Sequence, residues 1–152
     1  MTMTNSELAR TIAERAFADK TDKAGRPYVE HLERVANSAK EITFDPAFTD
    51  GDALKAVGWL HDILEDCPEW TIEHLRQIFG DEIADAVLAL TKNKDQSYRE
   101  YVERIKLNPL ARLVKLADLK DNMDLSRLDK LTEKDVERVK KYHEAFVFLL
   151  SK

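Results

Sequence analysis

The stretch ALKAVGWLHDILEDCP, residues 53–68, decides how this chain folds. Residues 53–64 are almost continuously apolar, and a helix that is apolar all round has to be buried on most of its sides. The apolar run stops before Cys67-Pro68, because proline cannot continue a helix. We therefore expect a central buried helix whose last turns carry one imidazole and three carboxylates, namely His61, Asp62, Glu65 and Asp66.

The composition is that of one globular domain. The chain has 152 residues, 43% of them hydrophobic and 35% charged, which excludes disordered and collagen-like classes. It contains only 4 Gly and 4 Pro, and no repeat or linker divides it, so long uninterrupted elements are favoured. We expect residues 1–152 to form a single compact domain.

Charge and cysteine content limit the partners and the setting. With 24 Lys+Arg against 29 Asp+Glu the net charge is −5, so the chain lacks the basic surplus of general nucleic-acid binders. Its single cysteine forms no internal disulfide, and no segment is typical of a signal peptide or of a membrane span. We expect a cytoplasmic protein, with a homodimer left open on base rates alone.

Apolar spacing and capping residues predict an all-α bundle of about seven to eight helices, with no strand. The expected helices run from a cap at Thr4 or Ser6 to Phe17, from Pro27 to about Ile42, over 53–64, from Thr71 to Phe79, over 81–91, over 98–107, from Pro109 past Asp118, and from Thr132 onward. The expected loops hold Asp45, Pro46 and Gly51, and residues 92–97. The last helix should turn Val136, Val139, Tyr142 and Phe146 inward.

Burying the polar residues that follow the apolar stretch would cost free energy. An unpaired buried charge costs several kcal/mol, and a divalent cation is a common compensation. On a helix His61 and Glu65 are four residues apart, as are Asp62 and Asp66, so each pair would project from one side. The alternative is a polar helix end in water, with no metal.

Two further residues favour the metal. His31 lies beside the apolar face of the helix after Pro27, and Asp118 follows an otherwise apolar stretch. A single histidine in such a place is more often a hydrogen-bonded core residue than a ligand. Together with His61 and Asp62, these residues form a set of four on three expected helices. A shared metal ion explains such a set better than four unrelated polar residues in the core.

The combination resembles the HD-domain metal-dependent phosphohydrolases, and in particular the hydrolase domain of RelA/SpoT-type alarmone enzymes and their small standalone relatives. The likeness covers roughly residues 23–123. It is carried by KAGRPYVEH (23–31), HDILED (61–66), FG (79–80), LTK (90–92), KLAD (115–118) and Asn122.

This resemblance implies a site and a cofactor. It assigns one divalent ion to His31, His61, Asp62 and Asp118, with Mn²⁺ as the family's usual choice; the nitrogen and oxygen donors would also suit Fe²⁺ or Zn²⁺. It implies acid–base work for Glu65 and Asp66. It implies substrate contacts by Lys23, Tyr28, Lys115 and Asn122. Independently of the resemblance, a phosphate ester approaching an acidic chain needs local cations, which Lys20, Arg26, Lys92 and Lys94 could also supply.

The implied activity is metal-dependent hydrolysis of the 3′-pyrophosphate of (p)ppGpp to GDP or GTP and pyrophosphate. Two alternatives stay open: hydrolysis of another nucleotide, such as a deoxynucleotide or an NADPH-like cofactor, and a non-catalytic binding module. The chain departs from the alarmone-hydrolase pattern by Asp22 and Ala24, where Arg and Ser are usual, and by Leu119 and Leu125, where Arg and Thr are usual. Asp22 and Leu125 favour a different nucleotide, whereas Glu65 and Asp66 favour the alarmone.

Three other reactive side chains are assigned no role in chemistry. No histidine is placed by sequence pattern to activate Cys67, so we expect it to pack as a small hydrophobe. His74 and His143 belong to ordinary amphipathic helices, so we expect both at the surface.

Overall fold

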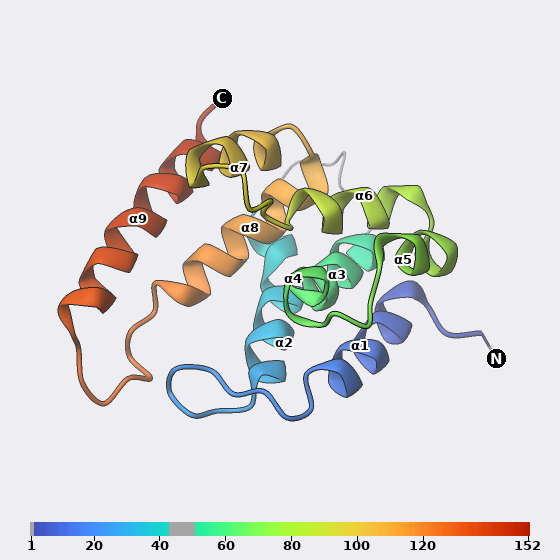
Figure 1. Ribbon diagram of the computed structural model, residues 1–152, viewed down its shortest axis with the longest axis horizontal. Helices are drawn as coiled ribbons and strands as arrows, with labels where there is room; N and C mark the ends of the chain where they lie inside the picture. Colours follow the sequence, from blue (N-terminus) through green and yellow to red (C-terminus); the bar gives the residue numbers. More distant parts are fainter. Residues whose placement is uncertain (1, 43–50) are drawn as a thin grey trace.

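The computed structural model describes residues 2–42 and 51–152, and over these residues the fold is all-α (Figure 1). The predicted fold class is confirmed. Within the described ranges the only β-type pairing is an isolated bridge between Thr21 and Pro27. The elements are α1 (Asn5–Ala16), α2 (Tyr28–Ser38), the 3-10 turn η1 (Ala39–Ile42), α3 (Gly51–Leu60), α4 (Ile63–Asp66), α5 (Ile72–Phe79), α6 (Asp81–Ala89), α7 (Tyr98–Lys106), α8 (Pro109–Asn122) and α9 (Glu133–Leu150).

Most helices begin after a residue whose side chain accepts a hydrogen bond from one of the first backbone amides, which have no partner within the helix. Thr4, Ser97 and Thr132 form capping boxes at the starts of α1, α7 and α9. Asn108 caps α8, whose first residue is Pro109. These caps are local in sequence, which is why the predicted helix starts agree with the structure. Of the predicted loop, Asp45 and Pro46 lie outside the described residues, whereas Gly51 is the first residue of α3 and was wrongly placed in the loop.

The predicted continuous helix over 53–64 is wrong. α3 ends at Leu60 and the single turn α4 begins at Ile63, so His61 and Asp62 lie in a turn between two helices. In a continued helix the carbonyl of Gly58 would accept the amide of residue 62; here it lies 2.7 Å from Nδ1 of the His61 ring. The side chain competes for that carbonyl, and the chain turns.

Two smaller expectations are also corrected. The helix expected to run from Pro27 to Ile42 has Pro27 as its cap and tightens to a 3-10 turn after Ser38. On α9 Val136 is 40% exposed instead of inward. The capping box places Asp135 on the buried side of the first turn, which leaves Val136 facing out.

α3 is the buried centre of the fold. Residues 56–60 are all buried, and α3 packs against α1, α2, α6 and α8. Gly58 faces α2 so closely that a Cβ built on it would lie 2.6 Å from Cα of Ala36. This close approach brings the start of α2 and the end of α3 together. Within the described residues, no helix has the length and apolarity needed to cross a membrane.

Replacing Gly58 with alanine is expected to destabilise the protein. Alanine is favoured over glycine inside a helix by about 1 kcal/mol, but the added Cβ would meet the backbone of Ala36, and overpacking typically costs about 1–3 kcal/mol. Subtracting the helix-propensity gain from the overpacking cost leaves a net loss of up to about 2 kcal/mol, which urea unfolding should detect. Gly51→Ala, whose Cβ would meet the Lys40 side chain at 3.5 Å, is the control. Equal midpoints for the two variants would contradict this packing.

The cap of α9 predicts a pH-dependent stability. Asp135 accepts hydrogen bonds from the Thr132 amide (2.9 Å) and the Arg138 guanidinium (2.6 Å), and these bonds lower the pKa of Asp135 to about 2. A depressed folded-state pKa contributes stability above the unfolded value near 3.8, and this contribution is lost as the pH falls towards 2. The difference in urea midpoint between the parent and Asp135→Asn should therefore be largest above pH 4 and should narrow below it. A pH-independent difference would count against the cap, and Asp129→Asn in the preceding loop is the control.

Candidate metal centre

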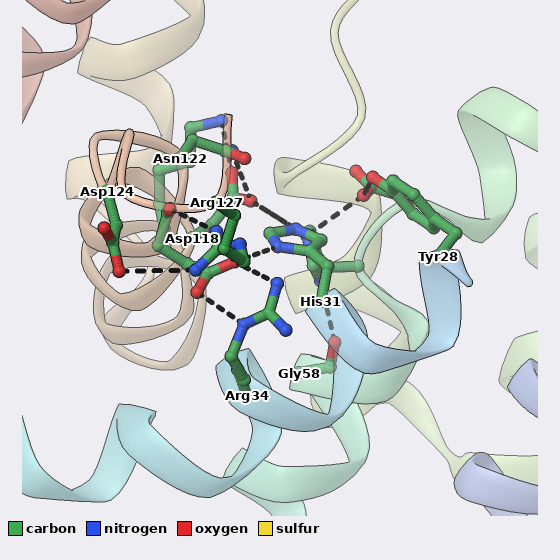
Figure 2. A network of polar contacts seen from close by, with 12 residues as sticks. Tyr28, His31, Arg34, Gly58, Asp118, Asn122, Asp124 and Arg127 are labelled. Carbon is green, nitrogen blue, oxygen red and sulfur yellow. Dashed lines mark hydrogen bonds and ion pairs between the residues drawn. The ribbon is translucent and has the colours of Figure 1, made fainter. Parts of the chain in front are cut away.

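Three elements converge on one buried cluster of ligand-type side chains. His31 comes from α2, His61 from the turn between α3 and α4, and Asp118 from α8, and they are only 3%, 2% and 5% exposed. One ligand atom from each lies within 4.8 Å of the others. Figure 2 shows His31 and Asp118 facing one another across the site. The structure therefore brings together three of the four predicted ligands.

The two imidazoles are oriented with one nitrogen towards the centre. Nε2 of His31 lies 3.0 Å from Oδ1 of Asp118, and Nε2 of His61 lies 3.3 Å from the same oxygen. Both Nε2 atoms are fully buried, and neither has a well-directed hydrogen bond. The opposite nitrogens are held at 2.7 Å by the Gly58 carbonyl, for His61, and at 2.6 Å by Asp121, for His31.

This arrangement fits a divalent cation. A carbonyl oxygen can only accept, so the Gly58 contact places a proton on Nδ1 of His61 and directs its Nε2 to the centre. Metal-binding histidines typically hold their other nitrogen in this way, through a carbonyl or a carboxylate. Two imidazole nitrogens and a carboxylate oxygen form a donor set suited to a first-row divalent metal ion.

Asp118 is the charged core of the cluster. Nζ of Lys115 lies 3.1 Å from its Oδ2, and Nδ2 of Asn122 donates to its Oδ1 at 3.0 Å. Burial alone would raise the pKa of Asp118, but the charge of Lys115 and the close contacts with the His61 and His31 imidazoles hold it well below its ordinary value. Asp118 is therefore an anion at neutral pH.

Asp62, the fourth predicted ligand, borders the cluster. Its Oδ2 lies 3.1 Å from Nε2 of His61 and accepts a 2.5 Å hydrogen bond from the Tyr28 phenol. Burial and the nearby carboxylates raise the pKa of Tyr28, so the phenol keeps its proton and donates. The structure thus places Tyr28, predicted as a substrate contact, on an acid of the centre.

Asp121 is a residue that the sequence analysis missed. It binds Nδ1 of His31 and accepts two hydrogen bonds from Arg34, at 2.7 and 3.1 Å. Burial opposes ionisation, but these hydrogen bonds lower the pKa of Asp121 to about 2. Its position three residues after Asp118 on a helix, on the same face, is the signal that could have identified it.

Glu65 and Asp66 are exposed residues of the single turn α4, just after the cluster in sequence, and belong neither to the buried cluster nor to the lining of the cavity beside it. Oε1 of Glu65 accepts the backbone amide of Lys92 at 2.6 Å, and Nζ of Lys20 donates to the Asp66 carbonyl at 2.6 Å. Partial desolvation raises the pKa of both carboxyls, and the charge of Asp62 adds to the effect.

Side chains of α7 hold the segment that contacts Glu65. Nη2 of Arg104 donates to the carbonyls of Ala89 and Thr91, and the Tyr101 phenol donates to the Leu90 carbonyl at 2.7 Å. Thr91 immediately precedes the amide that binds Glu65. Contacts to main-chain atoms leave no residue pattern, so the sequence analysis could not find them.

A cavity of about 470 Å³ lies beside the cluster. Of the predicted residues, its wall includes Lys23, Tyr28, His31 and Asn122, together with Asp22, Ala24 and Leu125 among those that depart from the alarmone-hydrolase pattern. Lys115 is not among the lining residues, because its ammonium group is turned to Asp118 and to the Tyr101 ring.

The other polar residues singled out in the sequence lie apart from this wall. Arg26 pairs with Glu30, and Nζ of Lys92 contacts the Asn93 carbonyl. As expected, Cys67 is buried, and His74 and His143 are exposed.

Comparison with known proteins identifies the family. The family model described as HD domain matches residues 9–142. The chain belongs to the HD domain family. This family implies a divalent metal ion, and the buried His31, His61 and Asp118 are a group that could hold it.

Several relatives of this HD domain are much longer proteins. The chain is 34% identical over 135 residues to a GTP pyrophosphokinase of Streptomyces coelicolor. It is 31% identical over 133 residues to a probable guanosine-3′,5′-bis(diphosphate) 3′-pyrophosphohydrolase of Synechocystis. These alignments cover 83% and 80% of the chain but only 15% and 16% of the relatives.

A solved structure shares the fold. It is described as a metazoan ortholog of SpoT that hydrolyzes ppGpp. The TM-score is 0.73 at 21% identity, over 99% of this chain and 87% of that one. At this identity the likeness establishes the arrangement of the helices.

The contact between Asp121 and His31 predicts a loss of metal affinity on mutation. Asp121→Asn removes the charge that orients the imidazole, and changes to such outer partners typically weaken metal binding about 10- to 100-fold. Titration calorimetry with Mn²⁺ should show this loss, with thermal unfolding to confirm that the variant is folded. Asp124→Asn, three residues further on and exposed, should leave the affinity unchanged. Equal affinities in the two variants would contradict the orienting role.

Proposed function

We propose that this HD domain, taken as residues 1–152, is a metal-dependent nucleotide phosphohydrolase that removes the 3′-pyrophosphate of guanosine alarmones, (p)ppGpp. The products are GDP or GTP and pyrophosphate. The observation that carries the proposal is the pair of buried Nε2 atoms of His31 and His61, directed at Asp118 beside a cavity of about 470 Å³. The names of the Synechocystis relative and of the solved SpoT ortholog support the choice of substrate.

In this proposal His31, His61 and Asp118 hold the ion, with Asp62 as the fourth ligand, and the ion is Mn²⁺, with Fe²⁺ or Zn²⁺ as alternatives. A bound divalent cation supplies Lewis acidity towards a phosphoryl oxygen and lowers the pKa of water. Tyr28 fixes the Asp62 carboxylate through its hydrogen bond.

Glu65 and Asp66 are the proposed proton-transfer groups. One oxygen of Glu65 is held by the Lys92 amide, which fixes the carboxyl group and leaves its second oxygen available. A carboxyl whose pKa is raised towards neutrality accepts and returns a proton more readily at the working pH. We assign Glu65 to remove a proton from the attacking water and Asp66 to support it.

The substrate contacts follow the cavity wall. Lys23 and Asn122 line it, so we assign both to the nucleotide. Nδ2 of Asn122 is bonded to Asp118, which leaves its carbonyl oxygen for the substrate. Lys115 acts through Asp118, whose charge it balances.

One observation favours a different nucleotide as the second candidate. Asp22 stands where alarmone hydrolases usually carry an arginine, and its Oδ1 accepts the amides of Ala24 and Arg26, both at 2.9 Å. Asp22 therefore fixes the conformation of the loop, and at this position the chain has no cationic side chain that could stack on guanine. Leu125 adds an apolar wall where a threonine is usual.

Product analysis separates these candidates. Purified protein with Mn²⁺ is incubated with ppGpp, GTP, deoxynucleotides and NADPH in separate reactions, with a chelator control. GDP and pyrophosphate from ppGpp alone would support the alarmone substrate. Metal-dependent turnover of another nucleotide alone would overturn it, and no turnover at all would favour a non-catalytic module.

Replacing Glu65 with glutamine tests the proton-transfer assignment. General acid–base groups typically contribute about 10²- to 10⁴-fold, so turnover should fall by about 100-fold or more. Metal binding should persist, because Glu65 lies outside the buried cluster. Glu69→Gln makes the same change on the exposed surface nearby and should keep full activity. Full activity in Glu65→Gln would refute the assignment.

A further inference from the structure

The end of α6 is held by side chains of a different helix. The last carbonyl groups of a helix have no amide partner within it, so they need donors from elsewhere. Nη2 of Arg104 lies at hydrogen-bond distance, 3.4, 3.0 and 2.5 Å, from the carbonyl oxygens of Leu88, Ala89 and Thr91. The Tyr101 phenol donates to the Leu90 carbonyl at 2.7 Å. Two residues of α7 therefore bind the consecutive carbonyls of residues 88–91.

Arg104 also brings a positive charge that α6 itself lacks at this end. The last turn of α6 contains no basic residue, although a cation stabilises the negative end of a helix dipole. Nε of Arg104 is fully buried and has no hydrogen-bond partner in the part of the chain that the structure describes. A buried donor without a partner costs free energy, which the bonds to the carbonyls have to offset. The position of the guanidinium is therefore set by its contacts with the main chain.

One peptide group connects Arg104 to Glu65. Its oxygen belongs to Thr91 and accepts the 2.5 Å hydrogen bond from Arg104. Its N–H belongs to Lys92 and donates to Oε1 of Glu65 at 2.6 Å. A peptide group is planar, so a partner that fixes the oxygen also fixes the direction of the N–H. Arg104 therefore controls the hydrogen bond that Glu65 receives.

We propose that Arg104 is a positioning residue for Glu65, acting through the peptide group between Thr91 and Lys92. The inference rests on the proposed function, in which Glu65 removes a proton from the attacking water. Arg104 belongs neither to the buried metal cluster nor to the lining of the cavity beside it. The orientation of the reacting carboxylate thus depends on α7, a helix that contributes no side chain to that lining.

The Lys92 amide is one of several influences on the ionisation of Glu65. Burial and the charges of Asp62 and Asp66 raise the pKa of Glu65. The bond from the Lys92 amide and the charge of Lys115 lower the same pKa. Losing the amide bond therefore leaves the pKa of Glu65 higher than in the parent. A base acts only in its deprotonated form, so the acid limb of the kcat profile would move to higher pH.

Kinetics of Arg104→Met test the proposal, because methionine is unbranched and has no donor to hold the carbonyls. With Mn²⁺ and ppGpp, kcat should fall by about 10- to 100-fold, since a misplacement of about 1 Å can cost about 100-fold. KM should be unchanged, because no residue of α7 lines the cavity. The acid limb should move to higher pH. A changed KM with the parental kcat, or a lower kcat with an unshifted pH profile, would overturn the proposal.

Arg99→Met is the matched control. It makes the same change on α7, at an exposed arginine that pairs with Glu103 one turn further on. Its kcat and pH profile should equal those of the parent. Losses equal to those of Arg104→Met would mean that any cation of α7 has the same effect, and would refute a specific role for Arg104.

Two more variants separate positioning from charge and from a general loss of structure. Arg104→Lys keeps the charge on a shorter side chain, so kcat should still fall, by less than in Arg104→Met; the parental kcat would show that charge alone acts on Glu65. In a Glu65→Gln background the proton-transfer group is already absent, so adding Arg104→Met should lower kcat no further. The same fold loss in both backgrounds would place the effect of Arg104 elsewhere and contradict the proposal.

Amide hydrogen exchange keeps the inference separate from the proposed activity. NMR of the full chain follows the Lys92 amide, which the parent protects by its bond to Glu65. Exchange should become about tenfold faster or more in Arg104→Met, as expected for losing a hydrogen bond to a charged group, and stay parental in Arg99→Met. This result supports the hold on Glu65 even if no nucleotide is hydrolysed, in which case only the proposed function fails. Equal exchange in all three proteins refutes the inference.

Discussion

The carboxylate of Asp118, sealed in the interior, is the constraint on which the rest of this structure depends. A buried charge without partners costs several kcal/mol, so the fold has to surround it with compensating groups. Lys115 and Asn122 come from the same helix, whereas His31 and His61 come from α2 and from the end of α3. The convergence of these three helices satisfies the carboxylate and at the same time creates a set of metal ligands.

The local features of the fold serve that convergence. Gly58 lets α3 approach the backbone of α2, and its carbonyl orients the ring of His61. The contact between the Gly58 carbonyl and the His61 ring also ends α3. A single glycine therefore sets both the distance between α2 and α3 and the turn that holds His61 and Asp62. Asp121 orients the His31 ring in the same way, through its contact with Nδ1. The groups that orient the two imidazole rings therefore also take part in the packing of the helices.

The sequence predicted the parts of this protein that depend on local patterns. Capping residues located the helix starts, and unfavourable burial together with the HD-type resemblance selected His31, His61 and Asp118. The continuous helix over 53–64 was wrong because periodicity does not register a side chain that takes a main-chain carbonyl. The Lys92 amide on Glu65 was missed for a related reason, since main-chain donors are the same in every residue. Asp121 was missed although its spacing of three residues from Asp118, on the same face of one helix, is visible in the sequence.

Anomalous X-ray diffraction from crystals grown with Mn²⁺ locates the bound ion without relying on activity. One strong anomalous peak is expected in the protein interior, within coordination distance of Nε2 of His31, Nε2 of His61 and a carboxylate oxygen of Asp118. A peak at any other place, or an interior in which these three side chains keep their direct contacts at saturating Mn²⁺, would contradict this expectation.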